Sequence, residues 1–139
     1  MSLLDGTICT SNKCFDCCLE TEMPLTIDDI KRIVRLGYEP EHFMEFNNGL
    51  WRLKNVNGKC VFLNERGLCE IHKHKPVGCR LYPIIEVDGT CTVDFEYCKF
   101  AYAITEEEIK KLCRYVVALN KLLDALRKDP MYRELRFLR

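Results

Sequence analysis

Apolar residues recur at helical spacing soon after the start of the chain. The stripe consists of Ile30, Ile33 and Val34. Thr26 precedes it as an N-cap, Asp29 stands three residues later at the capping-box position, and Gly37 is a typical C-terminal stop. This pattern predicts a short helix between Thr26 and Gly37. Residues 40–46 are predicted to form one further helical turn, with both phenylalanines facing the interior.

Two β-hairpins are predicted from segments that flank two-residue turns. Asn-Gly and Asp-Gly are preferred in type I′ turns, because both central residues need a positive φ angle. The predicted strands are 51–56 and 59–63 around Asn57-Gly58, and 84–87 and 90–95 around Asp88-Gly89. Alternation in the last strand places Cys91 on the face of Val93 and Phe95. We therefore interpret Cys91 as a small buried side chain.

A long amphipathic helix is predicted near the end of the chain. Thr105 and Glu108 form a capping box, and Pro130 breaks the helix, so we expect it to extend to about Lys128. Its apolar face consists of Ile109, Leu112, Cys113, Val116, Leu119, Leu123 and Leu126. Cys113 is interpreted as part of this face, and residues 131–139 as a short basic amphipathic tail. The predicted fold is α+β, a small irregular metal-stabilised domain with two β-hairpins, a short N-terminal helix and this long C-terminal helix.

Length and charge narrow the classes of function. At 139 residues the chain suits one domain, with a cysteine-rich metal-binding core over 9–100 and C-terminal helices over 105–139. The 21 Lys and Arg residues balance the 21 Asp and Glu residues, which argues against nucleic acid as a partner. No apolar run approaches the ~20 residues of a membrane span. The first residues also lack the pattern of a secretory signal. We therefore expect a cytoplasmic protein, with a protein partner left open.

The chain contains ten cysteines, although its 47% hydrophobic residues already suffice to form a core. Disulfides are typical of oxidising compartments, and the missing signal and the vicinal pair Cys17-Cys18 favour metal ligation instead. With Cys91 and Cys113 assigned to the core, eight candidate ligands remain. They are Cys9, Cys14, Cys17, Cys18, Cys60, Cys69, Cys79 and Cys98.

The spacing of the thiols indicates a cluster more than a zinc ion. A structural zinc ion and the common iron–sulfur clusters each take four ligands, so eight thiols fit two zinc ions, a cluster and a zinc, or one cluster with spare thiols. Cys9-x4-Cys14-x2-Cys17 has the first three positions of plant-type ferredoxin spacing. No Cys-x2-Cys pair is followed by a second one, as in a zinc ribbon. We favour an iron–sulfur cluster as the cofactor and keep zinc as the alternative.

Four other side chains near the candidate ligands are possible contributors to the site. Arg80 directly follows Cys79, and its guanidinium is a candidate for donating to sulfur or holding an anion. Tyr82 is interpreted as a packing lid over the same region. His72 and His74 lie among lysines in the turn-rich connector 64–83, so solvated imidazoles are favoured over ligands.

Several spaced motifs resemble the YkgJ-like CxxCxxCC family, whose members are described as zinc- or iron-chelating domains. The matching motifs, in order, are Cys14-x2-Cys17-Cys18, Leu25-Thr26-x2-Asp29-Ile30-x-Arg32-Ile33, Cys60-Val-Phe-Leu63 and Gly67-x-Cys69-x-Ile71-His72-x3-Pro76-x2-Cys79-Arg80-x-Tyr82-Pro83. The resemblance covers about residues 9–109 and implies metal chelation. The Cys9-x4-Cys14 spacing is longer than the family's usual one. Flagellin lysine N-methylases contain a similar cysteine region, but this chain has no glycine-rich loop for a methyl donor, so that activity is not carried over.

Three hypotheses follow for function. The first is a small cysteine-ligated metal-binding protein that holds an iron–sulfur cluster. The second is a cluster-dependent enzyme, redox or methylase-like, with Arg80 binding an anion. The third is a structural zinc protein or interaction scaffold that docks through its C-terminal helices.

Overall fold

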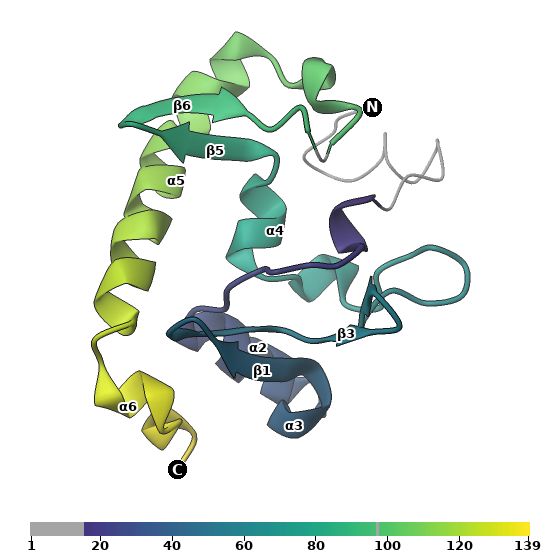
Figure 1. The fold of residues 1–139 in the computed structure, drawn as a ribbon, viewed down its shortest axis with the longest axis vertical. Coiled ribbons are helices and arrows are strands. Elements are labelled where there is room, and N and C mark those ends of the chain that lie inside the picture. Colours follow the sequence, from purple (N-terminus) through teal and green to yellow (C-terminus); the bar gives the residue numbers. More distant parts are fainter. Residues whose placement is uncertain (1–15, 97) are drawn as a thin grey trace.

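The computed structural model describes residues 16–96 and 98–139 (Figure 1). Two of the predicted ligands, Cys9 and Cys14, lie outside these ranges. The elements are η1 (Asp16–Cys18), α2 (Ile27–Arg35), α3 (Pro40–Phe43), β1 (Met44–Asn47), β2 (Leu50–Leu53), β3 (Asn55–Val56), β4 (Lys59–Cys60), η2 (His72–His74), α4 (Val77–Leu81), β5 (Ile84–Val87), β6 (Thr90–Val93), η3 (Ala101–Ala103), α5 (Glu106–Leu126), α6 (Pro130–Arg133) and η4 (Arg136–Leu138). Helices and antiparallel hairpins are mixed, so the predicted α+β class is confirmed.

Helix α2 begins at the predicted capping box. The Thr26 hydroxyl accepts a hydrogen bond from the Asp29 N–H (3.1 Å), and the Asp29 carboxylate accepts one from the Thr26 N–H (3.0 Å). Ile30 and Ile33 are fully buried. The predicted N-terminal helix is confirmed, because its cap and its apolar stripe both depend only on residues within the segment.

The strand pairing around β2 was predicted wrongly. Residues 50–53 pair with β1 across Asn48-Gly49, not with the segment after Gly58. Asn48 and Gly49 have φ angles of 53° and 80°, the values of a type I′ turn, so this Asn-Gly pair closes a third hairpin. Phe46 was expected inside a helical turn but lies on β1 and is 40% exposed. Its ring packs edge-on against Trp51 of the partner strand instead (5.1 Å between centroids).

The two predicted hairpins both form; β5 has the predicted bounds, and the other three strands are shorter than expected. β3 and β4 pair over two residues each around Asn57-Gly58, and β5 and β6 pair around Asp88-Gly89. The strand predicted to reach Leu63 stops at Cys60, and Leu63 instead forms an isolated bridge with Cys69.

Helix α5 joins two hydrophobic clusters. Its N-terminal half contributes Val116 to a cluster with the β5–β6 side of the molecule, and its C-terminal half contributes Leu123 and Leu126 to a larger cluster with α2 and β2. Figure 1 shows β5 and β6 beside this helix. The predicted capping box of Thr105 and Glu108 is present (3.0 and 3.1 Å), so the long C-terminal helix is confirmed.

The segment after Pro130 is not merely a basic tail. Tyr132 on α6 is fully buried, and its hydroxyl donates to the Leu25 carbonyl (2.7 Å) and accepts from the Trp51 N–H (2.8 Å). Helix α6 thus connects the C-terminal segment to the residues that precede α2 and to β2. Within residues 16–96 and 98–139, every helix is too short or too polar to serve as a membrane span.

Candidate metal centre

Six cysteine thiols line one cavity of about 1070 Å³. They come from separate stretches of the chain: η1, the end of β4, the connector after it, α4 and the loop before η3. The six are Cys17, Cys18, Cys60, Cys69, Cys79 and Cys98. All belong to the predicted set of ligands, and the fold brings them to a common wall although they lie far apart in the sequence.

Local hydrogen bonds shape the connector that returns Cys69 toward Cys60. The Asn64 side chain accepts from the backbone N–H groups two and four residues further along (2.9 and 3.1 Å). Such an Asx turn reverses the chain without help from regular strands. Cys69 then forms an isolated β-bridge with Leu63, and Leu63 lies three residues after Cys60 in the sequence.

Helix α4, which carries Cys79, packs closely against the N-terminal part of the cavity wall. A Cβ atom at Gly78 would collide with the sulfur of Met23, which also lines the cavity. Glycine therefore permits this approach, since any side chain would force Met23 to move. An exposed ion pair of Lys99 with Asp16 (3.6 Å) connects the Cys98 loop with η1.

The vicinal pair has two very different thiols. A hydrogen bond from the Cys18 thiol is the largest effect on Cys17 and helps to lower the Cys17 pKa to about 7. The same hydrogen bond, together with burial, raises the pKa of Cys18. Cys17 is therefore the thiolate of the pair near neutral pH, and Cys18 is the donor that stabilises it.

Burial raises the pKa of three further thiols of the cavity. Desolvation is the first cause for Cys60, whose pKa rises to about 11, and for Cys69 and Cys79. The Lys75 ammonium opposes this effect on Cys69 and Cys79, and it also lowers the pKa of Cys17. Sequence reasoning did not identify Lys75 as a charged neighbour of the thiols. Its position between two candidate ligands in the connector was the available signal.

The donor set suits a soft metal. The six candidate ligands are all sulfur, and thiolates select zinc, copper(I) and iron–sulfur clusters over hard cations. Within the described ranges, however, no three His, Cys, Asp or Glu side chains converge on a point where one ion could sit.

Arg80 and Tyr82 occupy different positions relative to the cavity. Arg80 is exposed, and its guanidinium donates to the Lys73 carbonyl (3.1 Å). Tyr82 lines the cavity and donates its hydroxyl to the Asp94 carboxylate (2.8 Å), which also lines the cavity. Burial and this hydrogen bond raise the pKa of Tyr82, so its proton stays in place at neutral pH. An anion-binding role for Arg80 and a lid role for Tyr82 stay predictions.

The two connector histidines lie on the exposed η2 turn. His72 and His74 are both exposed, as the neighbouring lysines led us to expect. His72 also borders the cavity, whereas the backbone carbonyl of His74 accepts a hydrogen bond from Arg32 (3.1 Å).

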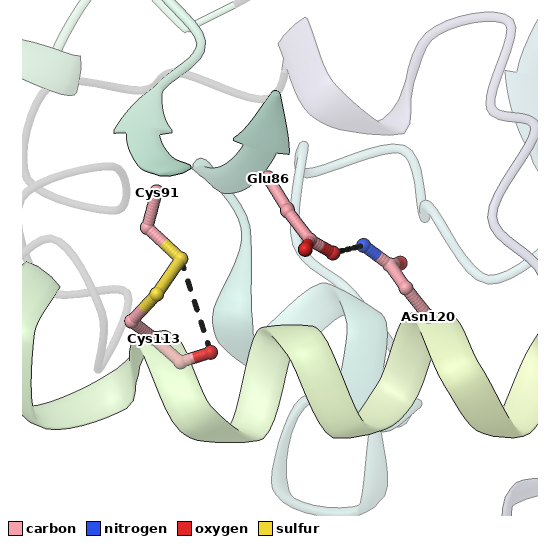
Figure 2. Close-up of a disulfide and its surroundings, with 4 residues drawn as sticks. All are labelled: Glu86, Cys91, Cys113 and Asn120. Atoms are coloured by element: carbon pink, nitrogen blue, oxygen red, sulfur yellow. Dashed lines mark hydrogen bonds between the residues drawn. A yellow bond between two sulfur atoms is a disulfide. The ribbon is translucent and has the colours of Figure 1, made fainter. Parts of the chain in front are cut away.

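Cys91 and Cys113 were predicted to be separate apolar side chains, and this was wrong. They form a disulfide that ties β6 to α5 (Figure 2). The sequence pattern placed each on an inward face but could not show that the two faces meet. The 3.8 Å approach of the Cys91 sulfur to the Cys113 carbonyl is only a contact, because a disulfide sulfur carries no proton. Nearby, the Asn120 amide donates to the Glu86 carboxylate (2.9 Å), a second link between this hairpin and α5.

Comparison with known proteins agrees with the chemistry of the cavity. The family model "CxxCxxCC: Putative zinc- or iron-chelating domain" matches residues 8–113, which include all of the cavity cysteines. The "Uncharacterized protein MJ0661" of Methanocaldococcus jannaschii is 33% identical over 116 residues, which cover 71% of this chain and 61% of that protein. The chain thus spans about three fifths of this relative. No solved structure matches the chain. By the extent of the family match, the chain belongs to the CxxCxxCC family of zinc- or iron-chelating domains.

Proposed function

We propose that this protein binds an iron–sulfur cluster in the cavity lined by the six described thiols. The observation that carries the proposal is that one wall collects soft sulfur donors from distant segments of the chain. Thiolates select soft metals such as zinc, copper(I) and the iron of a cluster, so six thiols on one wall support metal ligation.

Five of the thiols influence one another electrostatically. Cys79 is influenced by Cys17, Cys60 and Cys69, and the Cys60 and Cys69 thiols are each influenced by Cys17. Cys18 donates a hydrogen bond to Cys17 and is also influenced by Cys60 and Cys69. These mutual effects support proximity among the five, and a common cluster takes four thiolates. The other predicted ligands, Cys9, Cys14 and Cys98, remain candidates.

The size of the cavity favours a cluster over a zinc ion. In a zinc site every sulfur lies ~2.3 Å from the same ion, so all four must converge on one point. A cluster places several iron and sulfide atoms between its ligands, and its thiolates attach to different irons. The cavity of about 1070 Å³ has room for such a polynuclear group.

Metal and sulfide analysis of protein purified without oxygen tests the proposal. We expect a brown protein with visible sulfur-to-iron charge-transfer absorption and equal amounts of iron and acid-labile sulfide. Replacing Cys60, Cys69 or Cys79 by serine should reduce the bound iron strongly.

The double variant Cys91→Ala/Cys113→Ala is the matched control. It removes two cysteines that do not line the cavity, so its iron and sulfide content should equal that of the wild type. A colourless wild-type protein that contains only stoichiometric zinc would contradict the cluster and leave a zinc protein.

A further inference from the structure

An ion pair on α2 reaches across to the connector that carries the cavity residues. Asp29 is almost completely buried, and its carboxylate accepts a hydrogen bond from the Arg32 guanidinium (2.7 Å). The Arg32 side chain is 31% exposed, so one side of it faces solvent and the other faces the connector.

Both partners bind the connector backbone at adjacent positions. Arg32 donates through Nε to the His74 carbonyl (3.1 Å) and through Nη2 to the Lys75 carbonyl (3.0 Å). Asp29 accepts from the Val77 N–H (3.0 Å). The pair thus holds three backbone groups within four residues.

These bonds replace a cap that α4 does not make for itself. The first N–H groups of a helix have no partner inside the helix, and a side chain at the N-cap commonly supplies one. The N-cap of α4 is Pro76, which makes no side-chain capping bond. The Asp29 carboxylate fills this role at Val77, two residues before Cys79, from 48 positions earlier in the chain.

The segment held in this way contributes directly to the cavity wall. Lys75, Pro76 and Cys79 all line the cavity. The Lys75 carbonyl is one of the two backbone acceptors of Arg32, so the backbone that carries this lysine is held by the same contact.

We propose that Asp29 and Arg32 are positioning residues of the metal centre, which set the orientation of Lys75 and Cys79 by fixing the backbone of residues 74–77. This inference rests on the proposed function only in that the cavity binds a metal through its thiols. It does not depend on which metal is bound. Neither residue touches the metal, and each acts through the connector.

The test compares Arg32→Gln with two controls on the same helix. Arg35→Gln removes a neighbouring exposed arginine, and Ile33→Val weakens the core while it leaves the hydrogen bonds of Asp29 and Arg32 in place. The readouts are the affinity for Co²⁺ alone, followed by its sulfur-to-metal absorption, and the unfolding midpoint. We expect Arg32→Gln to lower Co²⁺ affinity about 10-fold or more and to alter the absorption band, the usual size of effect for residues that orient ligands. Both controls should bind within about twofold of the wild type, since neither touches an orienting contact.

Arg32→Lys separates charge from geometry. Lysine keeps the positive charge but lacks the planar fork that serves two carbonyls and a carboxylate together, so it should restore only part of the affinity. The inference is overturned if Arg32→Gln lowers the unfolding midpoint as Ile33→Val does while Co²⁺ affinity and spectrum stay those of the wild type. Wild-type protein that binds Co²⁺ but no iron and sulfide contradicts the proposed cluster alone.

Discussion

Cys17 is exposed and has a pKa lowered to about 7, whereas the pKa values of Cys60, Cys69 and Cys79 are raised. A thiolate reacts with alkylating agents and a thiol does not, so the low pKa makes Cys17 a reactive cysteine of the metal-free protein. The low pKa also favours metal binding, because less free energy is needed to remove the Cys17 proton at neutral pH.

Iodoacetamide should label Cys17 before the other cavity thiols in metal-free protein. The labelling rate is expected to rise with pH around a midpoint of about 7, because the thiolate fraction follows the pKa. Peptide mapping by mass spectrometry measures the rate. Cys60, with its pKa raised to about 11, provides the internal comparison and should react more slowly throughout. A Cys17 midpoint near the ordinary value of ~8.5 would count against this assignment.

Replacing Lys75 by methionine should move metal binding to higher pH. The ammonium lowers the pKa of Cys17, Cys69 and Cys79, and these thiols must lose their protons to bind a metal. Without the charge their pKa values rise, so the midpoint pH for Co²⁺ binding should increase by roughly 0.3–1 unit. Lys73→Met removes an exposed lysine of the same connector and should leave the midpoint unchanged. An equal shift in both variants would refute a specific effect of Lys75.

At the scale of elements, the positions of the turns could be predicted from the sequence, but which strands pair with each other could not. The three hairpins in the described part of the chain close with Asn-Gly or Asp-Gly, and every central residue has a positive φ angle. The missed hairpin also has this signal, at Asn48-Gly49. The sequence did not identify it, because residues 51–56 alternate well enough to pair with the segment before them or with the segment after them. The Phe46–Trp51 contact and the hydrogen bonds from Trp51 to α6 favour pairing with the segment before them.

The Cys91–Cys113 disulfide should stabilise the docking of the β5–β6 hairpin on α5. A cross-link between residues 22 positions apart restricts the unfolded chain by roughly 3 kcal/mol. Cys91→Ala/Cys113→Ala should therefore lower the free energy of unfolding by about that amount in denaturant titrations. Adding a reductant to the wild type should produce a similar loss and should have no effect on the variant. If non-reduced digests contain no peptide pair joined through these cysteines, the bond itself is refuted.

At the scale of the whole molecule, two sets of contacts hold distant segments together: the hydrophobic contacts of α5 and the contacts along the cavity wall. Helix α5 joins the two hydrophobic clusters by burial, with Val116 in one and Leu123 in the other. The cavity wall joins η1, β4, the connector and α4 through short strands and turns with few regular hydrogen bonds. A bound metal should therefore stabilise the second set of contacts far more than the first.

Removing the metal should loosen the cavity segments while α5 stays protected. Hydrogen–deuterium exchange of metal-free and metal-bound protein measures this difference residue by residue. We expect exchange in residues 58–79 to increase about tenfold or more on removal, because a metal that binds only the folded site stabilises it by mass action. The interior of α5 around Val116 and Leu123 should change little. Equal loss of protection in both regions would mean that the metal supports the entire fold.

The sequence alone determined the elements whose signals lie within a few residues. The capping boxes of α2 and α5, the turns at Asn57-Gly58 and Asp88-Gly89 and the abundance of thiols all follow from local chemistry. The candidate ligands were identified by residue type and motif, and their number exceeded what one centre needs.

Only the tertiary structure decided which of these residues meet. It brought six thiols and Lys75 to one cavity, joined Cys91 to Cys113, placed Tyr132 in the core and connected Asp29 to the start of α4. The physical reason is the same in each case. Periodicity and capping report on neighbours along the chain, whereas these contacts depend on how distant faces pack, which no single segment encodes.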